Sequence, residues 1–152
     1  MKALSEISEI LKNLDNILNE KIQLLNQILN ISENQSMFIL QLEDENSLNS
    51  YLSSSLKEKQ KIIDRIKIID DTFIKKFESF GGELNKNKDF FKDELKKMQN
   101  KIQSITDLDI KIRIQEEKNK PIFKNMGQNK KIKTLKANKD YILKKYSENN
   151  KK

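Results

Sequence analysis

A repeat of mostly apolar residues, at alternating spacings of four and three, runs from Leu48 to Phe80. Its positions are Leu48, Leu52, Ser55, Lys59, Ile62, Ile66, Ile69, Phe73, Lys76 and Phe80, widened on one side by Leu56, Ile63 and Phe77. This spacing keeps the repeated residues on one side of an α-helix. Such a helix would be roughly 50 Å long, at about 1.5 Å per residue, which exceeds the width of a compact small domain. We therefore predict a long helix that other long helices must cover.

The composition favours an all-α fold. Hydrophobic residues make up 36% of the chain and charged residues 35%, with three Gly, one Pro and no Val or Trp. This profile is typical of amphipathic helices with one side in water, and strand signals are nearly absent. We predict a long antiparallel helical bundle or coiled coil of three long helices, plus a shorter basic C-terminal helix.

The first predicted break lies in the acidic stretch 43–47. Before it, residues 4–42 carry a repeat of Leu and Ile broad enough to contact two neighbouring helices. Asn46 or Ser47 is the predicted N-cap of the next helix. Because no Gly or Pro enforces a turn here, one continuous rod over residues 1–80 is the alternative. We favour a turn, since the two repeats are out of frame with each other.

Glycine and asparagine mark the second predicted break. The pair Gly81-Gly82 follows the last apolar residue of the helix predicted at residues 47–80, where glycine favours a left-handed C-cap. Asn87 is the predicted N-cap of a third helix at residues 88–118. The three helices together form the predicted helical body, residues 1–118.

A basic C-terminal segment, residues 119–152, is the second predicted domain. Pro121 is expected to end or kink the third helix, since proline inside a helix costs about 3 kcal/mol. From Lys118 onward, twelve lysines are accompanied by only two acidic residues, Asp140 and Glu148. We predict that this segment is partly flexible alone and forms a helix against a partner.

Apolar residues recur at intervals among these lysines. They are Phe123, Met126, Ile132, Leu135, Ile142 and Tyr146. An intermittent apolar stripe flanked by charge suits a helix that binds in a groove, so we interpret these residues as contacts to a partner protein. A solvated tail, phosphate contacts to nucleic acid and binding to an anionic membrane surface are the alternatives. Nucleic acid is not expected, because no Arg follows Arg113 and the aromatic residues form no stacking platform.

The residue types exclude several kinds of chemistry. The chain has no Cys and no His, which removes disulfides, thiolate or imidazole metal sites and histidine-activated nucleophiles. The acidic runs 43–45 and 70–71 lack the further ligands that a divalent cation needs. Lys21, Lys59 and Lys76 interrupt the apolar repeats, and we interpret them as rim or register-setting residues rather than catalytic amines. We expect a protein that is not an enzyme and has neither cofactor nor metal.

The distribution of apolar residues predicts neither a signal peptide nor a membrane span. The apolar residues at the start of the chain are separated by polar ones, including Glu6 and Glu9. A signal peptide would have a continuous apolar stretch there. The longest uninterrupted apolar run is Met37–Leu40, so no membrane insertion is expected.

Three stretches carry a resemblance to a known family. A leucine-rich first helix, LSEISEILKNLDNILNEKIQLLNQIL, is followed by an acidic turn and by LKEKQKIIDRIKIID, which contains a K-x-x-I-I pattern. The third stretch, IQEEKNKPIFKNMGQNKKIKTLKANKDYILKKY, places an Asn before a basic helix that ends near a tyrosine. This order resembles the FlgN-type flagellar export chaperones of type III secretion, with the FliT type as a close relative. Pro121 departs from the family pattern.

The resemblance implies a specific function. Chaperones of this family are cytoplasmic and bind the C-terminal helices of hook-filament junction proteins, prevent their premature assembly and deliver them to the flagellar export gate. It implies that residues 119–152 carry the substrate contacts and that Tyr141 or Tyr146 docks to the gate. A homodimer is compatible with this function. The alternative, from the residues alone, is a structural coiled-coil protein whose basic tail binds nucleic acid or acidic surfaces.

Overall fold

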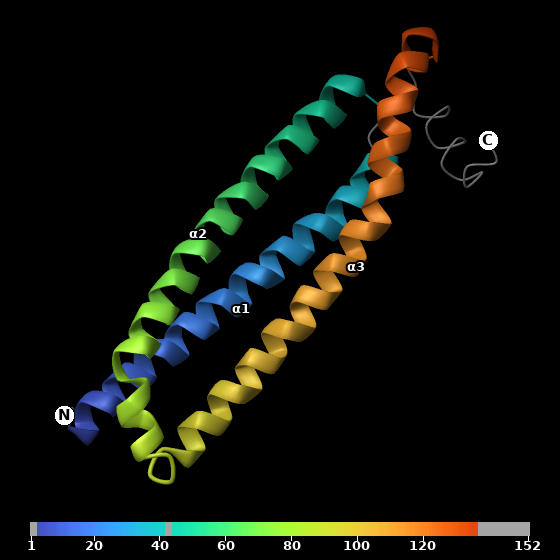
Figure 1. Ribbon diagram of the computed structural model, residues 1–152. Helices are drawn as coiled ribbons and strands as arrows, with labels where there is room; N and C mark the ends of the chain where they lie inside the picture. The colour runs from blue at the N-terminus through green and yellow to red at the C-terminus, as the bar shows by residue number, and fades with distance from the viewer. Residues whose placement is uncertain (1–2, 42–43, 137–152) are drawn as a thin grey trace. The chain divides into compact units, whose positions relative to one another are not determined.

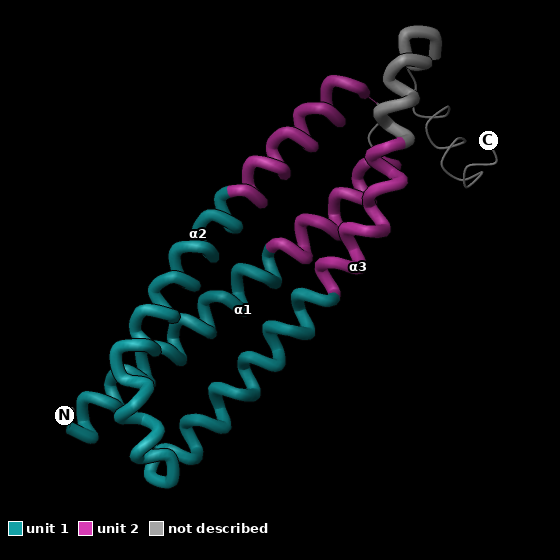
Figure 2. Tube along the Cα trace, viewed as in Figure 1, with its two compact units in different colours: residues 1–27, 61–110 teal, residues 28–60, 111–152 magenta. Residues whose placement is uncertain are grey.

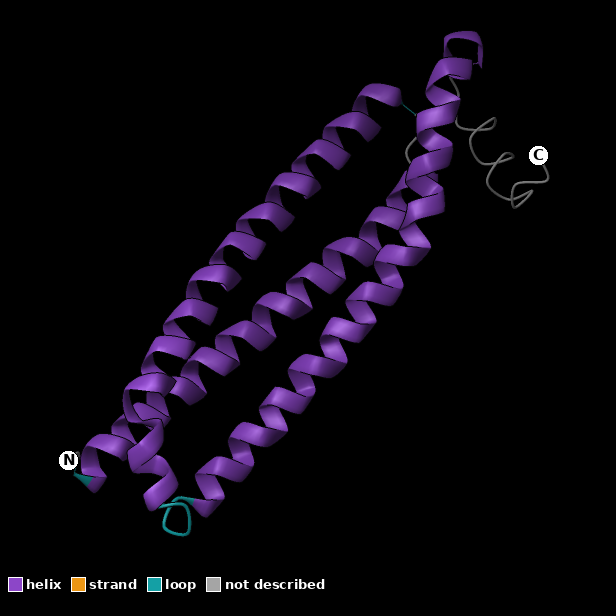
Figure 3. Ribbon diagram, in the orientation of Figure 1, coloured by secondary structure: helices purple, strands orange, loops and turns teal. Residues whose placement is uncertain are grey.

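The computed structural model of the chain describes residues 3–41 and 44–136, the last twelve of these through their backbone. Three α-helices account for most of this part: α1 (Leu4–Gln41), α2 (Glu45–Lys86) and α3 (Lys92–Lys136) (Figures 1 and 3). The residues described contain no strand. The protein is all-α, as predicted.

The helices pack into two compact units (Figure 2). Unit 1 comprises Met1–Gln27 and Lys61–Ile110, and unit 2 comprises Ile28–Gln60 and Lys111–Lys152. Each unit is therefore built from one segment of each helix. This division by packing differs from the boundary at residue 118, which follows the charge of the sequence and stays a prediction.

The core of unit 1 is apolar. Its buried side chains are Ile7, Leu11, Leu14, Leu18 and Leu25 of α1, Ile62, Ile69, Phe80 and Leu84 of α2, and Phe91, Met98 and Ile105 in and before α3. The apolar repeat of α2 predicts that Ile62, Ile66, Ile69 and Phe73 are buried. Ile62 and Ile69 are buried, whereas Ile66 and Phe73 are only half-buried. Burial of apolar side chains from all three helices is the main stabilising contribution to this unit.

Ion pairs join the helices at the edges of this core. Lys21 donates to Asp70 at 2.8 Å, and Lys101 donates to Asp15 at 2.5 Å. Lys21 interrupts the apolar repeat of α1, and its pairing with Asp70 places its ammonium group at the rim of the core rather than inside it. Both pairs are half-buried, and pairs of this kind orient neighbouring helices more than they add to stability.

The pair between α1 and α2 formed by Glu20 and Arg65 responds to pH. The guanidinium of Arg65 donates two hydrogen bonds to the Glu20 carboxylate, at 2.7 and 3.0 Å. This hydrogen bonding lowers the pKa of Glu20 below its usual value. A lowered carboxyl pKa in the folded state adds stability above the unfolded-state pKa, and this stability is lost as the pH falls through the folded-state value.

We expect Arg65→Ala to lower the melting temperature slightly at neutral pH and by a smaller amount in acid, once the pH has fallen through the lowered folded-state pKa of the Glu20 carboxyl. Thermal unfolding followed by circular dichroism at both pH values would measure the difference. A melting-temperature difference that stays constant between the two would contradict the assigned role of this pair.

Asp44 caps the N-terminus of α2. Its carboxylate accepts hydrogen bonds from the backbone N–H of Ser47 at 2.9 Å and from the Ser47 hydroxyl at 3.1 Å. The predicted turn is confirmed, since α1 ends at Gln41 and α2 begins at Glu45, and the continuous rod is excluded. The predicted cap is wrong: Asp44, and neither Asn46 nor Ser47, precedes the first helical residue and satisfies a free N–H there.

The predicted helix end at Gly81-Gly82 is wrong, because α2 continues through both glycines to Lys86. Each glycine in a helix costs about 1 kcal/mol relative to Ala. Phe80 and Leu84, on either side, are buried in unit 1, and burial of such side chains contributes about 1.5–3 kcal/mol each. Packing of the flanking residues therefore outweighs the local preference of glycine.

Asn87 ends α2 instead of capping α3. Its side-chain amide donates to the carbonyl of Glu83 at 2.7 Å, and its backbone N–H donates to the carbonyl of Leu84 at 3.0 Å. These bonds satisfy carbonyl groups of the last turn, which have no partner within the helix. A turn at residues 87–91 follows, and α3 starts at Lys92 rather than at the predicted residue 88.

The predicted end of the third helix at Pro121 is also wrong, because α3 continues through Pro121 to Lys136. The alternative, a kink at Pro121, stays a prediction. The described part of the chain therefore contains no separate basic C-terminal helix. Asn119 and Ile122, on either side of the proline, are buried in unit 2. The burial of Ile122 and the hydrogen bonds of the Asn119 side chain offset the cost of about 3 kcal/mol for proline inside a helix.

Candidate functional site

The core of unit 2 combines an apolar cluster with buried polar side chains. Ile39, Leu48 and Ile122 form the cluster, and Leu52 and Phe123 pack against it. Next to it lie Ser32, Gln35, Ser55, Lys59 and Asn119, which are all the polar residues that are buried in the part of the chain described. Unit 1 has no buried polar residue among those described, so this feature distinguishes the two units.

The spacing of the core positions explains why these polar residues are inside. In α1 the buried positions Leu25, Ile28, Ser32, Gln35 and Ile39 continue the alternation of three and four. This alternation keeps a residue on the side of the helix that faces its neighbours. Ser32 and Gln35 are therefore core residues by position although they are polar by type.

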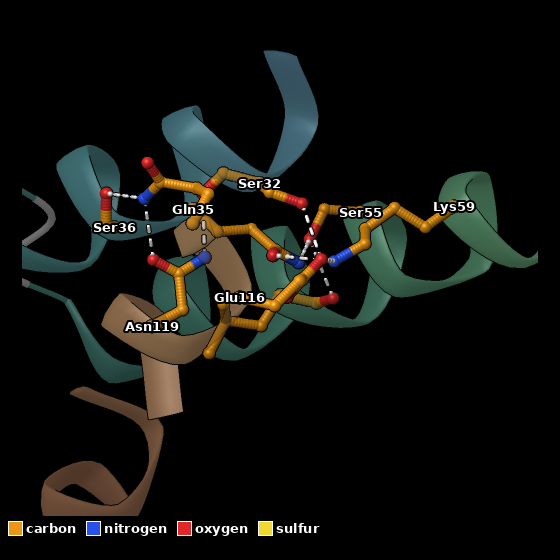
Figure 4. A network of polar contacts seen from close by, with 9 residues as sticks. Ser32, Gln35, Ser36, Ser55, Lys59, Glu116 and Asn119 are labelled. Atoms are coloured by element: carbon orange, nitrogen blue, oxygen red, sulfur yellow. Dashed lines mark hydrogen bonds and ion pairs between the residues drawn. The ribbon is translucent and has the colours of Figure 1, made fainter. Parts of the chain in front are cut away.

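The other two helices place polar residues at matching positions. Ser55 and Lys59 belong to the repeat of α2, and Glu116 and Asn119 are separated by three residues in α3. The six residues that share this level of unit 2 are named the polar layer: Ser32, Gln35, Ser55, Lys59, Glu116 and Asn119 (Figure 4).

An ion pair between α2 and α3 lies at the centre of the polar layer. The ammonium group of Lys59 donates to Oε2 of Glu116 at 2.5 Å and to Oε1 of Gln35 at 3.3 Å. The same Glu116 oxygen accepts a hydrogen bond from the hydroxyl of Ser32 at 2.7 Å. The Glu116 carboxylate and the Lys59 ammonium group each form a hydrogen bond with a residue of α1. All three helices therefore contribute to this one ion pair (Figure 4).

The amides complete the polar layer. Nε2 of Gln35 donates to the hydroxyl of Ser55 at 2.9 Å, which in turn donates to the backbone carbonyl of Leu52 at 3.0 Å. Nδ2 of Asn119 donates to the backbone carbonyl of Ser32 at 2.8 Å, and its Oδ1 accepts from Gln115 at 3.0 Å. Buried polar groups that find partners in this way avoid the cost of desolvation without a hydrogen bond.

The order of contacts along the helices gives their directions within unit 2. Gln35 of α1 contacts Ser55 of α2, and Phe38, further along α1, contacts Tyr51, earlier in α2, with ring centroids 5.2 Å apart. The segments of α1 and α2 in this unit therefore run antiparallel. Burial, and to a lesser degree the carboxylate of Glu58, raises the pKa of Tyr51.

The groups of the polar layer are occupied by contacts with one another and with the backbone. The side chain of Lys59 is 11% exposed and that of Glu116 is 34% exposed, so only the carboxylate has an edge in solvent. An ammonium nitrogen that donates to a carboxylate has no lone pair for nucleophilic attack. The two hydroxyls and the two amides are engaged as well: Ser32 donates to Glu116, Gln35 donates to Ser55 and accepts from Lys59, and Asn119 donates to the backbone carbonyl of Ser32.

The described residues of the two acidic runs form no metal site. Asp44 caps α2, and Asp70 accepts from Lys21. Within residues 3–41 and 44–136, no group of three or more side chains that could hold a metal ion comes together. In the same part of the chain, no helix is both long and apolar enough to cross a membrane.

The predicted partner contacts fall into three groups. Phe123 is half-buried and packs against the apolar cluster of unit 2, so at least part of its side chain serves the core. Met126, Ile132 and Leu135 lie in α3, where the structure describes the backbone. The remaining three, Tyr141, Ile142 and Tyr146, lie outside the described residues.

Four members of the polar layer were not anticipated: Ser32, Gln35, Glu116 and Asn119. A search for apolar residues ends the repeat of α1 at Ile28, because the next two core positions are polar. Continuing the alternation regardless of residue type would have found Ser32 and Gln35 in α1. The same spacing of four and three, continued from Ile112 in α3, leads to Glu116 and Asn119.

Comparison with family models, with curated proteins and with solved structures finds no match to this chain. Its function must therefore be argued from its own residues and from the resemblance in the order of its sequence features.

Proposed function

We propose that this protein is a cytoplasmic chaperone of flagellar type III export, which binds the C-terminal helices of hook-filament junction proteins. It would prevent their premature assembly and deliver them to the export gate. The observation that supports this proposal is the course of α3, which passes Pro121 and continues to Lys136, beyond the last described buried residue, Ile122. This extension of α3 beyond Ile122 carries Ile132 and Leu135 at helical spacing, where they can contact a partner helix.

The residues proposed to bind the substrate lie on and after this extension of α3. Ile132 and Leu135 occupy helical positions three residues apart. Lysines surround them, so a segment of this kind gains little from burial within its own fold. Binding of an amphipathic substrate helix would consume part of its free energy in ordering the segment, which keeps the complex reversible. Tyr141 or Tyr146 is proposed to dock to the export gate.

The proposed fold of the whole chain is a long antiparallel bundle of α1, α2 and α3.

Exposed apolar side chains of unit 1 agree with a protein that binds partners. Phe77 is partly exposed and contacts both the half-buried Phe73 and the buried Phe80, with ring centroids 6.3 and 5.9 Å apart. Single exposed apolar residues are common on protein surfaces, so the extension of α3 supports the proposal more strongly.

The lysine content of the C-terminal segment favours a second candidate function. Twelve lysines follow Glu117, and a structural coiled-coil protein could use them to bind nucleic acid or acidic surfaces. The affinity of such binding would fall steeply with salt, because it depends on the release of counterions. A chaperone complex held by apolar contacts would tolerate salt.

Replacing Leu135 and Ile142 with Ser tests the proposal, because this double variant keeps every lysine. Each lost apolar contact removes about 1.5–3 kcal/mol, so we expect the affinity for a junction-protein C-terminal fragment to fall by at least about 100-fold. Isothermal titration calorimetry would measure the affinity, and the melting temperature of the free protein should stay nearly unchanged.

The matched control replaces Lys139 and Lys144 with Gln and keeps every apolar residue. We expect a change of less than about tenfold in the affinity of this control. The proposed chaperone function would be rejected if the Ser variant bound as well as the parent while the Gln variant did not bind, since the segment would then be an electrostatic tail.

A further inference from the structure

The apolar repeats of this chain do not by themselves specify which helices pack together. The core positions of α1 and α2 are mostly Leu and Ile at alternating spacings of three and four. A helix with the same pattern, from this chain or from a second copy, could pack against such a surface with similar burial of apolar area. Selection of the correct third helix needs an additional feature.

The polar layer provides that feature in unit 2. The segments of α1 and α2 present to α3 one ammonium group, from Lys59, and one hydroxyl and one backbone carbonyl, both from Ser32. The matching groups of α3 are the carboxylate of Glu116 and, three residues later, the amide of Asn119. The layer is thus complementary in charge and in hydrogen bonding, and it involves all three helices (Figure 4).

A different third helix would leave Lys59 without its counter-charge and the Ser32 hydroxyl without its acceptor. An apolar helix at this level would place Leu or Ile against both groups, and each would lose a hydrogen bond at a largely buried position. Leaving a buried charge unpaired is far more unfavourable than replacing the whole pair with apolar residues. The layer therefore penalises incorrect packing more than it stabilises correct packing.

We infer that the polar layer selects α3 of the same chain as the third helix of unit 2 and rejects the apolar repeats of other helices, including those of a second copy. This role goes beyond the proposed chaperone function and does not depend on it. Buried polar residues in coiled coils select partners in the same way, at a cost in stability.

A charge exchange across the layer tests this inference. The chain has no Cys, so Ser36→Cys with Gln115→Cys introduces two thiols at positions whose side chains meet between α1 and α3, at 3.5 Å. A short bis-maleimide reagent would join them, and gel electrophoresis with mass spectrometry would separate products within one chain from products between chains.

Three charge variants are compared in this background: Lys59→Glu, Glu116→Lys and the two combined. Each single variant brings like charges together, so we expect the yield of the product within one chain to fall by at least about fivefold. The combined variant restores opposite charges, and the Gln35 amide and Ser32 hydroxyl can serve either orientation. Its yield should return to that of the parent. Parent yields in the single variants, or no recovery in the combined variant, would overturn the inference.

A second pair, Asp15→Cys with Lys101→Cys, serves as the control in unit 1. These side chains join α1 and α3 beside a core without buried polar residues among those described. Their product within one chain should form in all charge variants. This control distinguishes loss of the packing in unit 2 from unfolding of the chain.

Replacing the whole layer with apolar residues tests the selection directly. The variant carries Ser32→Ala, Gln35→Leu, Ser55→Ala, Lys59→Met, Glu116→Leu and Asn119→Leu. We expect an equal or higher melting temperature together with a rise of at least about tenfold in cross-linked products between chains. A variant that still gives products within one chain alone, at the parent's yield, would show that the layer is not needed for selection.

Discussion

Replacing Phe80 with Ala is expected to lower the free energy of unfolding by about 3–5 kcal/mol, the range for a fully buried aromatic side chain. Phe80 is 1% exposed in the core of unit 1 and contacts the ring of Phe77 edge to face. The substitution removes the transfer free energy of the ring and leaves a cavity that the helices can fill only in part. Urea denaturation followed by circular dichroism would measure the loss.

Phe90→Ala is the matched control for this prediction. Phe90 is 66% exposed in the turn before α3, so the same chemical change should alter the free energy of unfolding by no more than about 0.5 kcal/mol. A loss below about 1 kcal/mol at Phe80, or equal losses at both positions, would contradict the assignment of the core of unit 1.

Glu116→Leu is expected to lower the free energy of unfolding by about 2 kcal/mol, because it leaves the buried ammonium group of Lys59 without its carboxylate. The effect lies below the range for a fully buried pair, since a third of the Glu116 side chain reaches solvent. Lys59→Met combined with Glu116→Leu removes both charges. This double variant should recover to within about 1 kcal/mol of the parent or exceed it.

The matched control for this cycle is the pair of Lys120 and Glu117, which also lies on α3. Its side chains are 71% and 63% exposed, so Lys120→Met and Glu117→Leu, alone or combined, should each change stability by less than about 0.5 kcal/mol. Chemical denaturation of the four proteins in each cycle gives the coupling energies. Coupling of the same size in both cycles would mean that burial does not distinguish the two pairs.

The existence and type of the helices follow from the spacing of apolar residues. The first helix was predicted at residues 4–42 and is Leu4–Gln41, because a long repeat of Leu and Ile at helical spacing leaves few alternatives. The turn after it was also predicted, from the change of frame between two repeats. Both inferences depend on many residues, so that no single position decides them.

Helix ends were predicted less well because they were read from single residues. Glycine and proline lower helix stability by about 1–3 kcal/mol, and the inference at residues 81–82 and at Pro121 considered only this local effect. In the structure, Phe80, Leu84 and Ile122 are buried close to these positions and add comparable free energy in the opposite direction. Burial depends on residues distant in the sequence, which a local reading does not include.

The polar layer was missed for a different reason. Ser55 and Lys59 were recognised as members of a repeat, but their partners on α1 and α3 could not be paired with them from spacing alone. To pair them, one must know which residues of the three helices lie side by side. This alignment is set by the packing of whole helical segments. The alternation of three and four identifies core positions, whereas the contacts between Lys59, Gln35 and Glu116 emerge only in the folded chain.

The reciprocal contacts of the polar layer also constrain how sequences of this type can diverge. A change at Lys59 alone leaves the Glu116 carboxylate without its counter-charge, so an accepted change at one position should be accompanied by a compensating change at the other. Leu and Ile in the core of unit 1 can replace each other one at a time with a modest loss of stability. Each of them contributes buried apolar area and has no specific partner. Aligned relatives should therefore show paired substitutions at Lys59 and Glu116 and independent ones at Leu14 and Ile69.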